Sequence, residues 1–72
     1  MQNVYDMNGR LVAQQPDDAC TMQDVIDVLP ALGVTEWRQG VDTEEYWDEG
    51  AKCIASRVLV DGMEVGVIKD ER

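Results

Sequence analysis

A short run of acidic and aromatic residues, from Asp42 to Glu49, is the part of this sequence in which residue types and spacing suggest a function. Five carboxylates flank two aromatic side chains within eight residues. Aromatic side chains with charged neighbours are typical of protein interfaces, where a buried apolar centre is ringed by polar groups. We therefore predict a partner-binding site that consists of Asp42, Glu44, Glu45, Tyr46, Trp47, Asp48, Glu49 and Glu36.

Two other interpretations of this run stay open. Its carboxylates match calcium in ligand type, but the glycine-bearing spacing of an EF-hand loop is missing, so the alternative to a binding site is a solvated acidic face. Tyr46 and Trp47 could instead pack inward to complete a core that contains no phenylalanine. Cys20 and Cys53 have no CxxC spacing and no histidine beside them, so we expect reduced, partly buried thiols and no metal site.

The residue types give little support to an enzyme. Histidine is absent, which removes the commonest general base and the commonest metal ligand near neutral pH. A carboxylate pair could act as acid and base, but a small domain with fifteen acidic residues brings carboxylates together by chance. Neither of the glycine-rich phosphate-binding motifs occurs. We expect no enzymatic activity and no cofactor.

The charge of the chain lies in its centre. The net charge is −9, and the segment 17–49 carries all of it, because this segment has the single cation Arg38 while the two flanking segments are each neutral. A strong negative field repels nucleic acid and anionic membranes and attracts basic proteins. We therefore expect the partner to be a basic protein surface, that of a nucleic-acid-binding protein, with no direct binding to nucleic acid or membrane.

In length, charge and lack of catalytic residues the chain resembles the small inhibitors that phages and mobile elements encode, anti-CRISPR proteins among them. This resemblance implies an inhibitor or adaptor that docks its segment 17–49 on a basic groove. The alternative is a structural or assembly subunit of a phage or bacterial complex, in which the acidity serves solubility only. Acidic residues gathered on one face would favour docking, and even dispersion would favour assembly.

The length of the chain and its first residues indicate the number of domains and the location of the protein in the cell. A chain of 72 residues forms one domain, 1–72, that buries only roughly 60% of the surface its unfolded chain exposes. The first residues lack the basic and apolar regions of a signal peptide, and no apolar run approaches the length of a membrane span. We expect a cytoplasmic protein.

Two hairpins are predicted from their turns. Asp61-Gly62 separates alternating apolar runs and favours a type I′ turn, which pairs Val60 with Met63 and then Val58 with Val65. The same register puts Val67 and Lys69 on the core face with Val58. Asn8-Gly9 favours the same type of turn, so we expect a second type I′ hairpin. In it, Tyr5 lies opposite Val12 and Val4 lies opposite Ala13.

One helix is predicted between the hairpins, at about 22–32. Thr21 is its N-cap, with Asp24 three residues later in the place of the capping-box glutamate. Apolar residues follow at spacings of three and four, Pro30 kinks the helix or starts a separate turn, and Gly33 ends it. A helix this short is unstable alone, so it must pack on the sheet.

The remaining elements complete an α+β fold. The alternation of Val34–Gln39 predicts a middle strand. The run 41–50 is ambiguous between a short helical turn capped by Asp42 or Thr43 and a strand, and we favour a turn or short strand that leads into a strand at 52–60. The expected architecture is an antiparallel sheet of four or five strands, with one short helix packed on one face. Its exposed edges suggest a homodimer formed through a strand edge.

Overall fold

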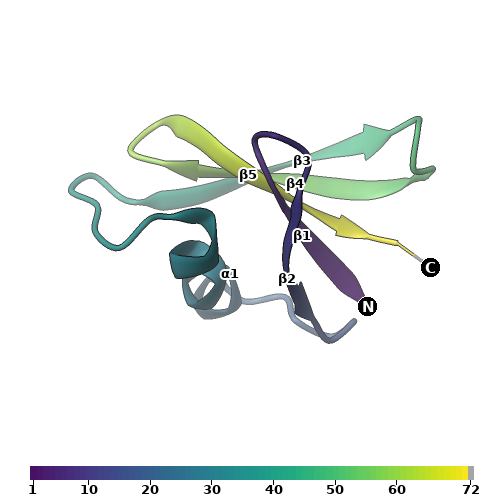
Figure 1. Cartoon of the computed structure of the whole chain (residues 1–72), viewed down its shortest axis with the longest axis horizontal. Helices are drawn as coiled ribbons and strands as arrows, with labels where there is room; N and C mark the ends of the chain where they lie inside the picture. Colours follow the sequence, from purple (N-terminus) through teal and green to yellow (C-terminus); the bar gives the residue numbers. More distant parts are fainter. Residues whose placement is uncertain (72) are drawn as a thin grey trace.

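The strands form one open antiparallel sheet, with one short helical segment packed against it, in a computed structural model that describes residues 1–71 (Figure 1). The strands are β1 (Gln2–Asp6), β2 (Leu11–Gln15), β3 (Val41–Asp48), β4 (Cys53–Val60) and β5 (Met63–Asp70). Their spatial order is β2-β1-β5-β4-β3. The helix α1 (Met22–Val28) continues into the 3₁₀ helix η1 (Leu29–Leu32). The predicted α+β fold is confirmed.

The turn between β4 and β5 is of the predicted type. Asp61 and Gly62 both have positive φ, 51° and 80°, as a type I′ turn requires. Val60 pairs with Met63, and Leu59 pairs with Glu64. The two-residue loop therefore follows from local sequence.

The predicted register of this hairpin is wrong beyond the first two pairs. Val58 pairs with Gly66, so Val65 is an extra residue that forms a β-bulge. An extra residue exchanges the two faces of the strand, and Ile68 rather than Lys69 therefore faces the core. The alternation could not reveal this, because apolar residues follow Gly66 on both faces of β5.

Gly66 shows why the bulge is needed. A Cβ atom at this position would lie 2.6 Å from Cδ2 of Leu32 and 2.7 Å from the backbone oxygen of Tyr5. The bulge thus places a glycine where Leu32 of η1 packs against β5.

The first hairpin exists, but its turn is not type I′. The N–H of Gly9 donates to the carbonyl of Asp6 at 3.0 Å, and only Gly9, with φ of 79°, has positive φ in this loop. This is a type I turn followed by a left-handed glycine, which makes the loop three residues long. Val4 pairs with Ala13 as predicted, but Tyr5 pairs with Leu11 instead of Val12, because the register shifts after Val4.

The helix begins and ends as predicted. The side chain of Thr21 accepts the N–H of Asp24 at 3.2 Å, and the Asp24 carboxylate accepts the N–H of Thr21 at 2.9 Å, so the capping box is complete. Pro30 lies in the first turn of η1, and Gly33 ends it with φ of 81°. Proline therefore tightens the helix into a 3₁₀ turn without ending it.

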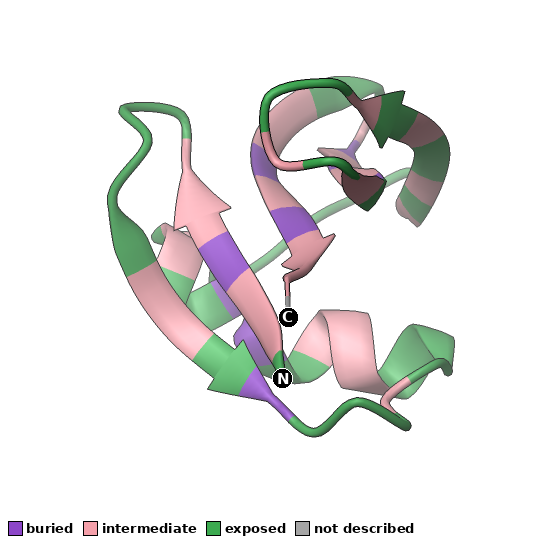
Figure 2. Ribbon diagram, turned by 90° about the vertical axis from the view of Figure 1, so that its right-hand side faces the viewer, coloured by how far each residue is buried: buried purple, intermediate pink, exposed green. Residues whose placement is uncertain are grey.

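The core lies between the helical segment and the sheet. Its buried positions, purple in Figure 2, come from five elements, which are β1, α1, η1, β4 and β5. These positions are Val4, Val28, Leu29, Val58, Val60 and Ile68. We call the side of the sheet that carries α1 the helix face and the opposite side the outer face.

The predicted strand at Val34–Gln39 is wrong. This segment is an irregular loop, and the side chain of Asp61 binds the backbone N–H groups of Arg38, Gln39 and Gly40. The backbone N–H groups of this segment thus bond to a carboxylate of the distant turn, where those of a strand would bond to a neighbouring strand. For the next run, predicted as a turn or short strand, the strand alternative is right, and this strand is β3, with eight residues.

Candidate protein-interaction surface

Most of the predicted site lies on β3, which is an edge strand. All its residues pair with β4, from Val41 opposite Val60 to Asp48 opposite Cys53. In the sheet order of residues 1–71, nothing lies on its other side. An edge strand exposes backbone hydrogen-bonding groups and offers a template for another chain.

Strand alternation divides the predicted site between two faces. Asp42, Glu44, Tyr46 and Asp48 lie on the outer face, whereas Glu45 and Trp47 lie on the helix face with Thr43. Glu49 follows in the turn after β3, and Glu36 lies in the loop before it. The structure thus brings six of the eight predicted residues onto one strand, but not onto one flat surface.

Arg57 compensates part of the charge on the outer face. Its Nη1 lies 3.0 Å from Oε1 of Glu44, its Nε lies 3.4 Å from Oε1 of Glu64, and its guanidinium lies 4.1 Å from the ring centre of Tyr46. These partners are partly exposed, so the pairs contribute little to stability. Through these contacts, however, Glu44 and Tyr46 already have a cationic partner within the protein itself.

Asp48 has a structural role. Its Oδ1 accepts the N–H of Ala51 at 3.0 Å, and its Oδ2 lies 3.0 Å from Nζ of Lys69. The bond from Ala51 and then the contact with Lys69 hold the pKa of the Asp48 carboxyl below its usual range. The same contact raises the pKa of Lys69. Asp48 therefore ties the β3–β4 turn to β5.

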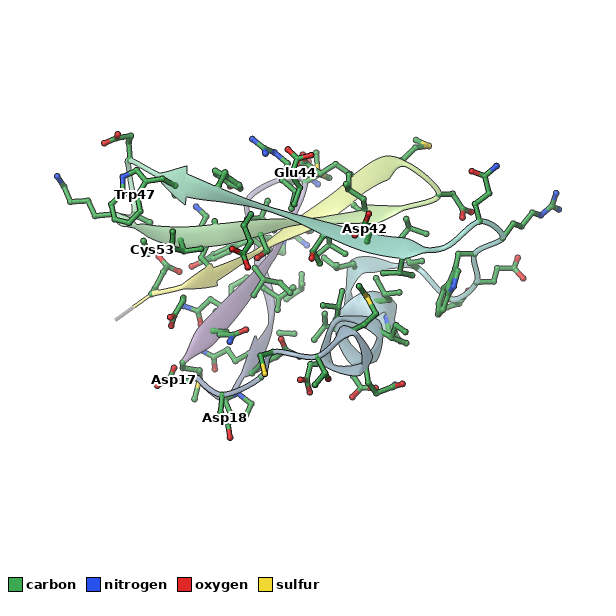
Figure 3. The ribbon with its side chains drawn as sticks, turned by 180° about the vertical axis from the view of Figure 1, so that it is seen from behind. Asp17, Asp18, Asp42, Glu44, Trp47 and Cys53 are labelled. Atoms are coloured by element: carbon green, nitrogen blue, oxygen red, sulfur yellow. The ribbon has the colours of Figure 1, made fainter. Side chains whose placement is uncertain are left out.

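Trp47 does not complete the core. Trp47 is 53% exposed, and it lies at the end of β3 (Figure 3). It lies opposite Ile54, which is equally exposed on the helix face of β4, and Met22 of α1 is exposed as well. Three exposed apolar side chains therefore lie on the same side of the sheet as Glu45. Trp37, in the loop before β3, is less exposed.

A groove with a volume of about 350 Å³ separates the start of α1 from the helix face of the sheet. We call it the α1–sheet groove. Its lining includes four carboxylates and no lysine or arginine, and these are Asp17, Asp24, Glu45 and Asp70. One oxygen of Asp70 is buried without a hydrogen-bond partner among the described residues. Neither Asp70 nor Ile54 belongs to the predicted site, although the two-residue period places Ile54 on the same face of β4 as Val58 and Val60.

The charge of segment 17–49 is not gathered on one face. In Figure 3, Asp17 and Asp18 lie on the loop before α1, away from Asp42 and Glu44 on β3. The acidic residues of this segment are therefore divided between the β3 edge, the loop before α1, α1 itself and the loop before β3. The α1–sheet groove extends from the loop before α1 to β3, since Asp17 and Glu45 both line it.

The two cysteines do not form an evident reactive site. Both are free, and burial and then the Asp48 charge raise the pKa of the Cys53 thiol, which lowers its thiolate fraction. Among residues 1–71, no three side chains of the metal-ligating types come together. Over the same residues, no helix has the length and apolar character that a membrane crossing requires.

The chain matches no protein-family model, no curated protein and no solved structure at a significant level.

Proposed function

We propose that this protein is a small cytoplasmic interaction module, an inhibitor or adaptor, that docks its acidic β3 edge on the basic surface of a nucleic-acid-handling protein. The proposal depends on one observation above all: β3 is an edge strand with carboxylates on both faces and a half-exposed tryptophan at its end. Such a ridge combines an apolar anchor with a charged rim.

The unpaired charges on β3 and in the turn after it favour a cationic partner. Within residues 1–71, the ion pairs of this region involve Glu44 and Asp48, whereas Asp42, Glu45 and Glu49 have no cation beside them. Uncompensated carboxylates increase the rate of association with basic proteins and disfavour acidic ones. A basic groove that normally holds phosphates supplies the complementary charge.

A second function is favoured by a different observation. Because Asp17 and Asp18 lie away from Asp42 and Glu44, part of the acidity is dispersed over the molecule. Charged side chains on an edge strand also prevent aggregation. Both facts fit a structural or assembly subunit whose acidity keeps it soluble.

Two charge-matched variants separate these functions. Asp42→Asn with Glu45→Gln removes two charges from β3, and Asp18→Asn with Asp27→Asn removes two charges elsewhere. Each protein is immobilised, exposed to a bacterial lysate at two salt concentrations, and washed with duplex DNA, after which the bound proteins are identified and quantified.

A docking module captures basic nucleic-acid-binding proteins that are released by salt and by DNA. This capture falls for the β3 variant and persists for the other one. Equal capture by both variants, or capture that does not depend on salt, would contradict docking through β3 and favour the assembly subunit.

A further inference from the structure

The free edge of β3 exposes a defined set of backbone groups. The N–H of Asp61 donates to the carbonyl of Gly40 at 2.9 Å, and the N–H of Lys52 donates to that of Asp48 at 2.7 Å, so both of these carbonyls point toward β4. Alternate residues of an antiparallel strand point their backbone groups in opposite directions. The groups that point away from β4 therefore belong to Val41, Thr43, Glu45 and Trp47.

The same four residues have their side chains on the helix face. A strand added to this edge would place the residues that bond to β3 directly opposite them, with side chains on that face as well. On the helix face, the side chains of the added strand meet Glu45, the exposed ring of Trp47 and the α1–sheet groove. On the outer face Glu44 and Asp48 already have Arg57 and Lys69 as partners, which leaves Asp42 there, whereas on the helix face the carboxylates of the α1–sheet groove add to Glu45.

Charge decides which occupant fits. A lysine or arginine opposite Glu45 gains an ion pair, its aliphatic part can pack on Ile54, and its charged end can reach the acidic groove that Asp24 and Asp70 line. Beside Trp47, a cation gains a contact with the indole ring. A second copy of β3 would instead oppose carboxylates with carboxylates, which is destabilising.

We infer that β3 accepts one extended basic segment of the partner as a sixth strand, antiparallel to it, with the cationic side chains on the helix face. This inference rests on the proposed function, since it states how the basic partner is held. Main-chain bonds supply affinity in this binding mode, and alternate side chains supply specificity.

Peptide probes test the orientation. The first is a capped octapeptide that alternates lysine with valine. The second has the same sequence with the backbone nitrogens of its four lysines methylated. In the third, the backbone nitrogens of the four valines are methylated. All three have equal charge, and methylation removes one N–H per site. We expect methylation at lysine to weaken binding at least tenfold and methylation at valine to leave it nearly unchanged, as measured by the backbone amide shifts of 41–47 and by the fluorescence of Trp47 in a variant that lacks Trp37.

A protein variant tests the same edge. Thr43→Pro removes an N–H that points away from β4, and proline is tolerated on edge strands at such positions. It should weaken binding of the unmodified peptide at least tenfold, whereas the control Thr43→Ala should not. The peptide series decides the question even if Thr43→Pro does not fold.

Three outcomes overturn the inference. Equal, salt-dependent binding of all three peptides would exclude strand addition while leaving electrostatic docking, and thus the proposed function, in place. Preference for the lysine-methylated peptide would show that the cations lie on the outer face. A dimer in sedimentation that Thr43→Pro dissociates would show that a second copy occupies the edge.

Discussion

The carboxylate of Asp61 accepts the backbone N–H of Arg38 at 3.0 Å, from a turn that is 23 residues further along the chain. The same carboxylate accepts the N–H groups of Gln39 and Gly40, at 2.5 and 3.0 Å. These bonds, that from Arg38 first, hold the pKa of Asp61 below its ordinary value of 3.8. A turn residue of the β4–β5 hairpin thus positions the loop that leads into β3.

Asp61→Asn should lower the melting temperature at pH 7, because an amide oxygen accepts these N–H groups more weakly than a carboxylate, while asparagine still tolerates the positive φ. Since the folded pKa is depressed, the contribution of Asp61 is complete above about pH 3.8 and is lost as pH falls through the folded value. Melts of both proteins from pH 7 to pH 2.5 should therefore converge at low pH. A constant difference over this range would contradict the role assigned to the charge.

Gly66→Ala should destabilise the protein by about 1–3 kcal/mol, because the added Cβ meets Leu32 and the rigid backbone oxygen of Tyr5. Gly50→Ala is the matched control, since its Cβ would lie an ordinary 3.4 Å from Oδ1 of Asp48. Denaturant unfolding of both variants measures the difference. Equal stabilities would mean that η1 does not pack on the bulge of β5.

Leu29→Ala should cost about 2–5 kcal/mol, because Leu29 is fully buried between the helical segment and the sheet. Ile54→Ala removes an aliphatic side chain that is half exposed and should cost much less. Free energies of unfolding from urea titrations test this order. If Ile54→Ala proves the more damaging change, the core does not lie where α1 and η1 cover the sheet.

Trp47→Ala should change stability by only about 0.5 kcal/mol, as for an ordinary surface position, yet weaken binding of the partner by about 2 kcal/mol or more. Trp37→Ala removes the other exposed tryptophan, which lies outside β3, and should leave binding intact. Thermal melts and dissociation rates distinguish the two effects. Unfolding of Trp47→Ala would make this residue part of the core, whereas unchanged binding would exclude it as an anchor.

Several features of this protein follow from the sequence alone, because they depend on residues within a few positions of one another. Asp61-Gly62 adopts positive φ at both residues, and Thr21 and Asp24 cap the helix reciprocally. These are local preferences of backbone and side chain, so they act before any distant contact forms. The concentration of acidic residues in 17–49 is likewise visible in the order of the residues along the chain.

Tertiary structure alone decided the geometry of the site. The bulge at Val65 depends on Gly66 meeting Leu32, and the loop before β3 depends on Asp61, so no local window contains either cause. The sheet order leaves β3 at an edge, and its alternation sends Glu45 and Trp47 to one face and Asp42 and Glu44 to the other. Strand register and edge position result from long-range pairing, and a shift of one residue exchanges the faces, which is why a run of charges along the sequence could not specify a surface.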